Sequence, residues 1–181
     1  MTSELRKMKK FRFQLLCEWI VEYFSPCKVA DIGGGKGLLT YLLKESGFES
    51  MVIDPFDQAL PLKYKDLQGI KHKIPKEEIV RRVQKDFETD MARYYDLLIG
   101  LHAHGSNMKI IEASAKYNTN FILLSCCVID EPIEKKPDID WFVSLEGYAR
   151  KLGHKTKRFE LNFGGQNVGF SAMNRPEFVQ K

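Results

Sequence analysis

The sequence predicts an α/β protein with a doubly wound, mainly parallel β-sheet, helices on both faces and an antiparallel edge. Three observations lead to this prediction. Apolar strands alternate with amphipathic helices along most of the chain. A glycine turn joins the first strand to the helix after it, as in nucleotide-binding βαβ units. Two late strands, separated by a GGQN turn, provide the antiparallel edge.

The first elements form the βαβ unit. Apolar side chains at helical spacing predict a helix within residues 4–24, which ends before Pro26. A strand at 28–32, a helix at 38–46 and a strand at 50–53 follow. Glycine turns of this kind let a ligand approach the backbone where the first strand ends.

The middle of the chain is less regular. Residues 57–74 are expected to form a loop with a short helix, and 76–83 a helix behind Pro75. A short strand is expected at 83–87. The remaining expected elements are strands at 96–101, 121–129, 155–163 and 168–174 and helices at 107–116 and 141–152.

Composition narrows the class of protein. With 44% hydrophobic and 29% charged residues among 181, the chain has the composition of an ordinary globular domain. It has no apolar run of the roughly 20 residues that a membrane span needs, and no signal-peptide core, so we expect a cytoplasmic protein without a membrane partner. Its formal net charge of +4 permits an anionic partner such as RNA. The cysteine spacing predicts neither a disulfide framework nor a zinc site.

The segment VADIGGGKGLLTYLL, Val29 to Leu43, does not fit the dinucleotide fingerprint GxGxxG. Leu38 stands where the third glycine would be, and starting one residue later puts Lys36 at the second glycine. Asp31, just before the turn, would repel a pyrophosphate and attract a ligand that carries an ammonium and a sulfonium. Asp54 ends the next strand, where an acid accepts hydrogen bonds from ribose hydroxyls.

Together these residues resemble motif I and the following acidic motif of class I S-adenosylmethionine-dependent methyltransferases. The segment DLLIGLHAHG, residues 96–105, resembles the LHACG-type fourth-strand motif of a group that includes tRNA 2′-O-methyltransferases. LSCC, residues 124–127, stands where that group has a Cys-Cys pair. The chain departs from the group at His104, where cysteine is usual, and at Ser125, where proline is frequent.

The resemblance implies a Rossmann-like methyltransferase fold with S-adenosyl-L-methionine as cofactor. It divides the chain, expected to be one domain, into an N-terminal helix (1–25), a cofactor-binding core (27–130) and the C-terminal part of the sheet (131–181). It also implies that Asp86 accepts the exocyclic amine of adenine and that Phe87 covers the ring. The implied cofactor-binding residues are Asp31, Gly33, Gly34, Gly35, Gly37, Asp54, Pro55, Asp86, Phe87, Gly100 and Leu101.

Methyl transfer from a sulfonium needs an aligned nucleophile, and a hydroxyl nucleophile benefits from a base. The candidate catalytic residues are His102, His104 and Asp130, which follow the fourth and fifth predicted strands. If the fourth strand persists, alternation places both histidines on one side. No metal site is expected, since no third ligand accompanies the two histidines.

The expected substrate is RNA, with tRNA or rRNA first. Methylation of a protein side chain or a small metabolite is the alternative enzyme activity, and a partner subunit that supplies recognition fits so short a chain. An inactive methyltransferase-like binding module is a third possibility. For the glycine turn itself, two other interpretations stay open: a structural turn with two helix-capping acids, and an NAD site.

Overall fold

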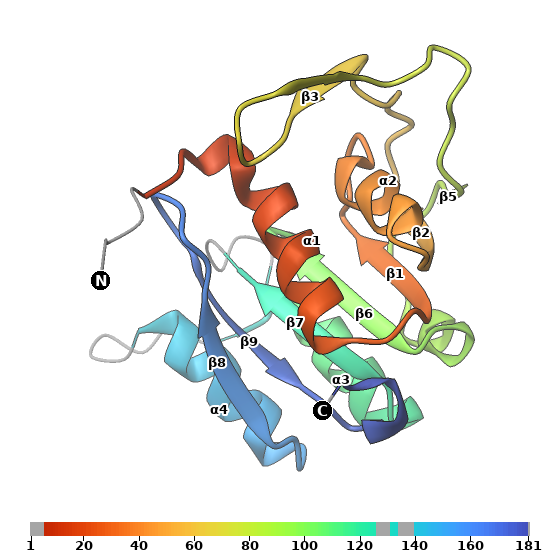
Figure 1. Cartoon of the computed structure of the whole chain (residues 1–181). Helices are drawn as coiled ribbons and strands as arrows, with labels where there is room; N and C mark the ends of the chain where they lie inside the picture. The colour runs from red at the N-terminus through yellow and green to blue at the C-terminus, as the bar shows by residue number, and fades with distance from the viewer. Residues whose placement is uncertain (1–5, 126–130, 134–139, 181) are drawn as a thin grey trace.

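Seven strands form one sheet in the computed structural model, which describes residues 6–125, 131–133 and 140–180 (Figure 1). In spatial order they are β5 (Arg82–Val83), β2 (Glu49–Ile53), β1 (Lys28–Ile32), β6 (Leu97–Leu101), β7 (Asn120–Leu124), β9 (Val168–Ala172) and β8 (Thr156–Glu160). The first five are parallel, and β9 pairs antiparallel with both β7 and β8. The predicted fold class is therefore confirmed.

The order of the strands reverses at β1. The chain passes from β1 to β2 on one side and later returns to β6 on the other. In open α/β sheets, ligands bind at the carboxyl ends of the strands where the order reverses. The rim after β1, β2 and β6 is therefore the expected ligand site.

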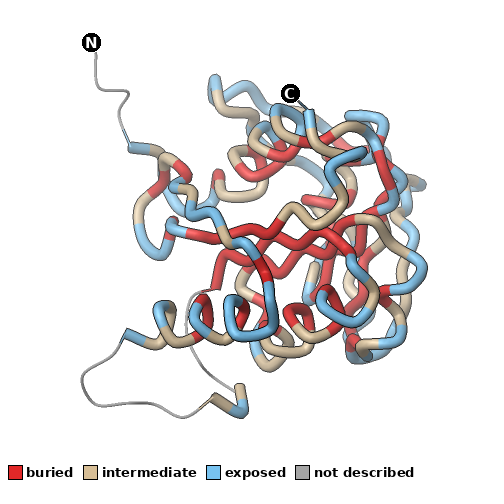
Figure 2. Tube along the Cα trace, turned by 90° about the horizontal axis from the view of Figure 1, so that it is seen from below, coloured by how far each residue is buried: buried red, intermediate tan, exposed pale blue. Residues whose placement is uncertain are grey.

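Helices cover both faces of the sheet, because successive side chains of a buried strand point to opposite faces and both sets are apolar. Val29 of β1 packs with Leu16 of α1 (Arg12–Tyr23) and Leu39 of α2 (Leu38–Glu45) in one apolar cluster. Ala30, its neighbour, joins the opposite cluster with residues of α3 (Asn107–Tyr117) and α4 (Trp141–Lys151). Figure 2 shows the buried strands between the two layers. Short 3-10 helices lie at Lys9–Phe11, Thr89–Tyr94 and Pro176–Phe178.

The N-terminal helix begins later than the sequence pattern predicts. Lys7 pairs with the chain near the turn between β8 and β9: its N–H donates to the Asn162 carbonyl (3.0 Å), and its carbonyl accepts from Gly164 N–H (2.9 Å). Extended pairing thus uses backbone groups that a helix starting at residue 4 would need, and α1 begins at Arg12.

The predictions for residues 57–83 are wrong. The short helix is replaced by a hairpin of β3 (Lys63–Lys65) and β4 (Lys71–Lys73), and the helix at 76–83 is absent. The apolar residue Ile79 is 79% exposed, so the segment does not gain through this residue the apolar burial on which short helices depend. The strand expected at 83–87 is the two-residue β5, which ends at Val83.

The later elements agree with the sequence pattern within a few residues, although residues 126–129 of the expected fifth parallel strand lie outside the described residues. Among the helices of the described ranges, none is both long and apolar enough to cross a membrane.

Candidate functional site

The glycine turn after β1 folds back against the strand that precedes it. Gly33, Gly35 and Gly37 have φ values of 67°, 53° and 80°, in the left-handed region that favours glycine. The Gly37 N–H donates to the Gly34 carbonyl (2.9 Å), which closes the turn. A Cβ on Gly34 would lie 2.6 Å from Asp31 Oδ2, so the loop backbone sits directly on that carboxylate.

Asp31 is almost fully enclosed, with 2% of its surface exposed. Its Oδ2 accepts a hydrogen bond from Thr40 Oγ1 at 2.9 Å. Burial raises the pKa of Asp31 from 3.8 to about 6, although the hydrogen bonds from Thr40 oppose the rise. No salt bridge is formed by Asp31 within the described ranges, so a cationic ligand at this loop would stabilise the charged form.

Asp54 connects the end of β2 to the same loop. Its Oδ2 accepts from the Gly35 N–H and its Oδ1 from the Phe56 N–H, each at 2.9 Å. Each carboxylate oxygen can accept a further hydrogen bond, so the group can hold the loop and still receive hydroxyls. Pro55, which follows it, is exposed at the rim.

Arg82 is a site residue that the sequence analysis missed. Its guanidinium donates to the carbonyls of Gly35 (2.8 Å), Gln58 (2.9 Å) and Phe56 (3.2 Å), and its side chain is only 10% exposed. It therefore fixes the glycine loop to the chain after β2. The sequence analysis expected Arg82 to lie on a helix at 76–83, and an arginine on a helix face is not predicted to contact the glycine loop.

The other residues predicted to bind the cofactor lie outside the glycine loop. Phe87 is 2% exposed and belongs to the apolar cluster beneath α3, while Asp86 beside it is exposed. A Cβ on Gly100 would lie 2.7 Å from Leu123 and 2.8 Å from Ile110, so this glycine lets α3 pack closely on β6. Leu101 is buried in the cluster beneath α1 and α2. The adenine contacts of Asp86 and Phe87 stay predictions.

His102 follows β6 in a left-handed conformation with φ 56°. Its backbone N–H donates to Leu124 O (2.9 Å), and its Nε2 lies 3.5 Å from Gln166 O. Burial lowers the pKa of His102 from 6.5 to about 4, and the positive charges of Lys9 and Arg12 act in the same direction. The imidazole is therefore neutral at physiological pH.

β6 ends at Leu101, so the strand does not persist to the two histidines, and the condition under which alternation would align them is not met. His104 is exposed two residues further on. Asp130, Cys126 and Cys127 lie outside the described residues.

Glu131 holds the start of α3, which follows the two histidines in the chain. Its carboxylate accepts from the backbone N–H groups of Asn107 (2.7 Å) and Met108 (3.1 Å) and from Asn107 Nδ2 (2.7 Å). Ser125 Oγ donates to Asn107 Oδ1 at 2.5 Å. An acid at the N-terminus of α3 satisfies otherwise unpaired N–H groups and complements the helix dipole. Buried Asn107 thus links the ends of β6 and β7; an asparagine as the first residue of the expected helix is the signal that could have found it.

Comparison with solved structures identifies the architecture. A SAM-dependent methyltransferase from Archaeoglobus fulgidus is 18% identical, with a TM-score of 0.55 over 91% of this chain and 96% of that one. Human N-acetylserotonin methyltransferase in complex with SAM is 11% identical, with a TM-score of 0.51 over 91% of this chain and 51% of that one. The fold is that of class I methyltransferases. In this fold, the glycine loop over Asp31 follows β1, the first strand along the chain.

Sequence relatives are longer proteins. A probable tRNA (uracil-O(2)-)-methyltransferase of Caenorhabditis elegans is 36% identical over 107 residues, and its counterpart in Caenorhabditis briggsae is 33% identical over 103. Each match covers 57% of this chain but only 18% of the relative. No protein-family model matches the chain.

Gly34→Ala is expected to damage the site through the contact with Asp31. The new methyl group would lie 2.6 Å from Asp31 Oδ2 and 3.0 Å from its carbonyl oxygen, so the loop must move. We expect the free energy of unfolding to fall by about 1–3 kcal/mol, as for other overpacked sites. We expect S-adenosylmethionine affinity to fall at least ~10-fold, which corresponds to about 1.4 kcal/mol; calorimetric titration measures it.

Gly147→Ala is the matched control. Gly147 lies inside α4, and a Cβ there meets nothing within 4 Å. This change should stabilise the protein by about 0.5–1 kcal/mol and leave ligand affinity unchanged. Equal affinity of the Gly34→Ala variant and the wild type would show that the loop does not hold the ligand.

Proposed function

We propose that the protein is an S-adenosylmethionine-dependent methyltransferase that acts on RNA, with tRNA as the first substrate to test. The observation that supports the cofactor most directly is the enclosed carboxylate of Asp31 beneath the glycine loop. An ammonium or sulfonium there would compensate the charge that burial makes unfavourable. A pyrophosphate would instead increase the repulsion.

The residues present fit this cofactor. In this proposal, backbone groups of Gly33 to Gly37 would hold its methionine part, and Asp54 at the next strand end would accept from the ribose hydroxyls. When bound, the cofactor supplies a methyl group that is already activated for displacement. The work left to the protein is to align the nucleophile and remove its proton.

His102 is the residue that we propose for this work, with His104 and Asp130 as the other candidates. Its lowered pKa keeps the imidazole neutral, which leaves a ring nitrogen able to accept a proton or a hydrogen bond. Arg82, Glu131 and Asn107 are positioning residues in this proposal. They fix the two loops that meet at the rim.

RNA is the substrate favoured by two observations. Two longer relatives, each matched over only 18% of its length, are named as probable tRNA methyltransferases. The surface also carries a basic hairpin beside the glycine loop. We further propose a cytoplasmic location, one domain, and recognition that a partner subunit can supplement. Methylation of a protein side chain or metabolite, and an inactive scaffold, are the competing functions.

Titration calorimetry with S-adenosylmethionine and, separately, with NAD tests the proposal. Saturable binding of S-adenosylmethionine alone supports it and justifies assays of radiolabelled methyl transfer into tRNA and into protein extracts. Binding of NAD alone would overturn it. Binding of neither would favour the scaffold.

A further inference from the structure

The hairpin of β3 and β4 occupies the connection between the parallel strands β2 and β5 (Figure 1). Such crossovers usually contain a helix that covers the sheet. Here residues 54–81, all of them described, contain the hairpin and no helix. The sheet thus carries a separate antiparallel ribbon next to its ligand-binding rim.

Contacts with the N-terminal segment hold this ribbon in place. Gln14 Nε2 donates to Lys65 O (2.6 Å), and Lys7 Nζ donates to Leu67 O (2.8 Å). Within the turn, Asp66 Oδ1 accepts from the Ile70 N–H (2.8 Å). These bonds give the hairpin a fixed orientation relative to α1.

One face of the hairpin is aromatic. Tyr64 stacks on His72 with ring centroids 5.0 Å apart, and Tyr41 of α2 meets Tyr64 edge-on at 6.2 Å. His72 Nε2 lies 2.7 Å from Asp66 Oδ2. Because successive side chains of a strand point to opposite faces, the lysines of the hairpin all lie on the face opposite Tyr64 and His72.

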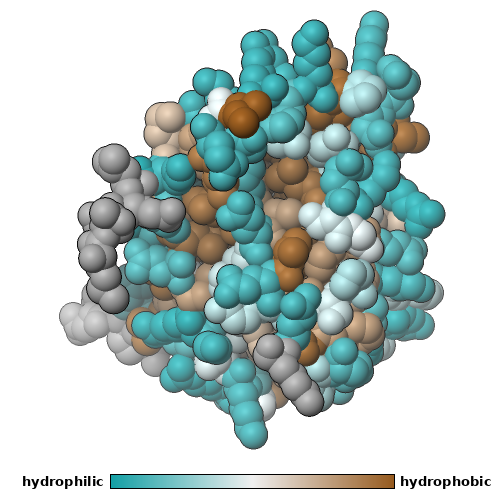
Figure 3. Space-filling view, viewed as in Figure 1, coloured by the Kyte–Doolittle hydropathy of each residue, from teal (hydrophilic) through white to brown (hydrophobic). Residues whose placement is uncertain are grey.

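The opposite face carries four exposed lysines, which we call the lysine face: Lys63, Lys65, Lys71 and Lys73. The register puts Lys63 opposite Lys73 and Lys65 opposite Lys71. Like charges directly opposite each other destabilise a strand pair. Within the described residues none of the four ammonium groups takes part in a hydrogen bond or a salt bridge. This concentration of uncompensated positive charge is suited to a polyanion. In Figure 3, hydrophilic side chains project from the upper edge, where the hairpin lies.

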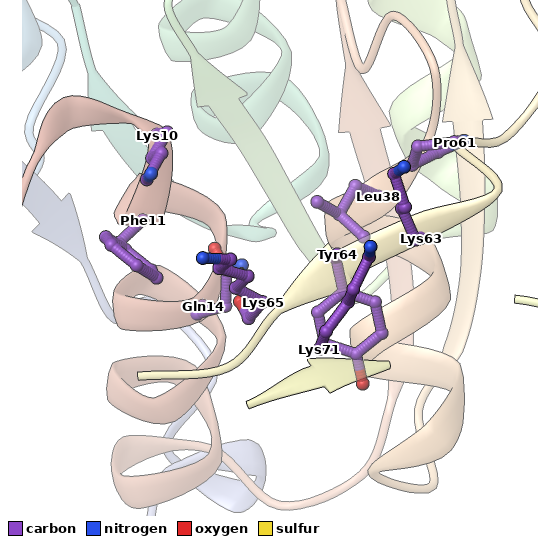
Figure 4. Close-up of a pocket in the computed structure, with 9 residues that line it drawn as sticks. All are labelled: Lys10, Phe11, Gln14, Leu38, Pro61, Lys63, Tyr64, Lys65 and Lys71. Atoms are coloured by element: carbon purple, nitrogen blue, oxygen red, sulfur yellow. The ribbon is translucent and has the colours of Figure 1, made fainter. Parts of the chain in front are cut away.

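A cavity of about 300 Å³ adjoins the lysine face and extends towards the glycine loop. Three of the lysines line it together with Phe11, Gln14, Tyr64 and Leu38, the residue that follows Gly37 (Figure 4). Gln14 is 8% exposed, and its Oε1 has no hydrogen-bond partner among the residues that the structure describes. An unpaired buried acceptor favours a ligand that brings N–H or O–H donors as well as negative charge.

We infer that the lysine face binds the phosphate backbone of the RNA substrate and that the cavity beside it receives a nucleotide of the same strand. This inference rests on the proposed RNA-directed function and assigns the docking surface for it. A polynucleotide provides regularly spaced phosphates for the lysines and sugar or base donors for Gln14, whereas inorganic phosphate provides only the charge. The position beside Leu38 brings the bound strand to the cofactor loop.

The test is the double variant Lys71→Glu, Lys73→Glu. It places a glutamate opposite Lys65 and another opposite Lys63, so the hairpin gains two complementary pairs and its melting temperature should not fall. Binding of a fluorescently labelled tRNA transcript is measured by anisotropy at several salt concentrations. We expect at least ~10-fold weaker binding and a decrease of about 2 in the slope of log affinity against log salt, one for each lysine lost.

The matched control is Lys151→Glu, Lys155→Glu, which makes the same change in net charge at the end of α4, away from the hairpin. It should keep tRNA affinity within about threefold of the wild type, since screening limits charge effects over such distances. Both variants should bind S-adenosylmethionine like the wild type, measured by calorimetry.

Equal losses in the two double variants, or no loss in either, would overturn the lysine face as the docking surface while leaving the methyltransferase proposal intact. Wild-type protein that binds S-adenosylmethionine but not the transcript would overturn both the docking surface and RNA as substrate. Failure to bind S-adenosylmethionine, with tRNA binding that depends on the lysine face, would overturn only the proposed cofactor.

Discussion

Asp31→Asn is expected to abolish S-adenosylmethionine binding in a protein that stays folded. Asparagine has nearly the same shape and can still accept the hydrogen bond from Thr40 Oγ1 that Asp31 Oδ2 accepts. It removes the charge that the ligand's cationic groups would meet and replaces one carboxylate oxygen with an NH2 group. We expect affinity to fall at least ~100-fold, about 2.7 kcal/mol, in a calorimetric titration.

The same variant should be more stable than the wild type at neutral pH. The folded protein holds the Asp31 proton up to about pH 6, whereas the unfolded chain releases it near 3.8. The contribution of Asp31 to the free energy of unfolding is therefore most favourable below pH 3.8. It falls by about 3 kcal/mol in total as the pH rises to 6. Asp31→Asn removes this loss, so its advantage should be present at pH 7.5 and vanish near pH 4.

Urea denaturation of both proteins at the two pH values measures this difference. Wild-type affinity for S-adenosylmethionine should also weaken as the pH drops below about 6, because the protonated carboxyl no longer attracts a cation. Undiminished affinity in the variant, with a stability gain at pH 7.5, would show that the buried charge serves no cationic ligand.

His102→Gly is expected to reduce methyl transfer strongly with little effect on cofactor affinity. The left-handed backbone at His102, φ 56°, is unfavourable for a side chain by roughly 1–2 kcal/mol, and glycine relieves it. This relief offsets the greater freedom that glycine gives the unfolded chain, so stability should change by no more than about 1 kcal/mol. Loss of a general base lowers turnover by about 10²–10⁴-fold.

The measurements are kcat with saturating cofactor and the dissociation constant of S-adenosylmethionine, which should change by less than about threefold. Wild-type kcat/KM for the RNA, measured with saturating cofactor, should show no loss from titration of His102 between pH 8 and about 5, because the pKa of His102 lies near 4. Asn118→Gly is the matched control: it relieves the same conformation, φ 52°, at the end of α3 and should leave kcat unchanged. Equal kcat in the His102 variant and the wild type would remove His102 from the mechanism.

Local patterns were enough to predict the parallel core of this protein. The strands β1, β6 and β7 are buried on both faces over most of their length, and such strands are recognisable in sequence because most of their side chains are apolar. The glycine turn and its acid were equally visible. Positive φ at Gly33, Gly35 and Gly37 is a local requirement that only glycine meets without strain.

Tertiary contacts decided the region between β2 and β5. The segment around Ile79 has the composition of a helix, yet Ile79 stays 79% exposed and the chain instead brings Arg82 to the glycine loop. The hairpin forms because Gln14 and Lys7 bind its backbone from a segment more than fifty residues earlier.

The electrostatic character of the site was also a product of the fold. The sequence by itself determined that an aspartate precedes the glycines and that histidines follow the fourth parallel strand. Only the tertiary structure decided that Asp31 is enclosed, that His102 is neutral, and that four lysines share one exposed face. These properties depend on desolvation and on distances between groups far apart in the chain, which no local pattern encodes.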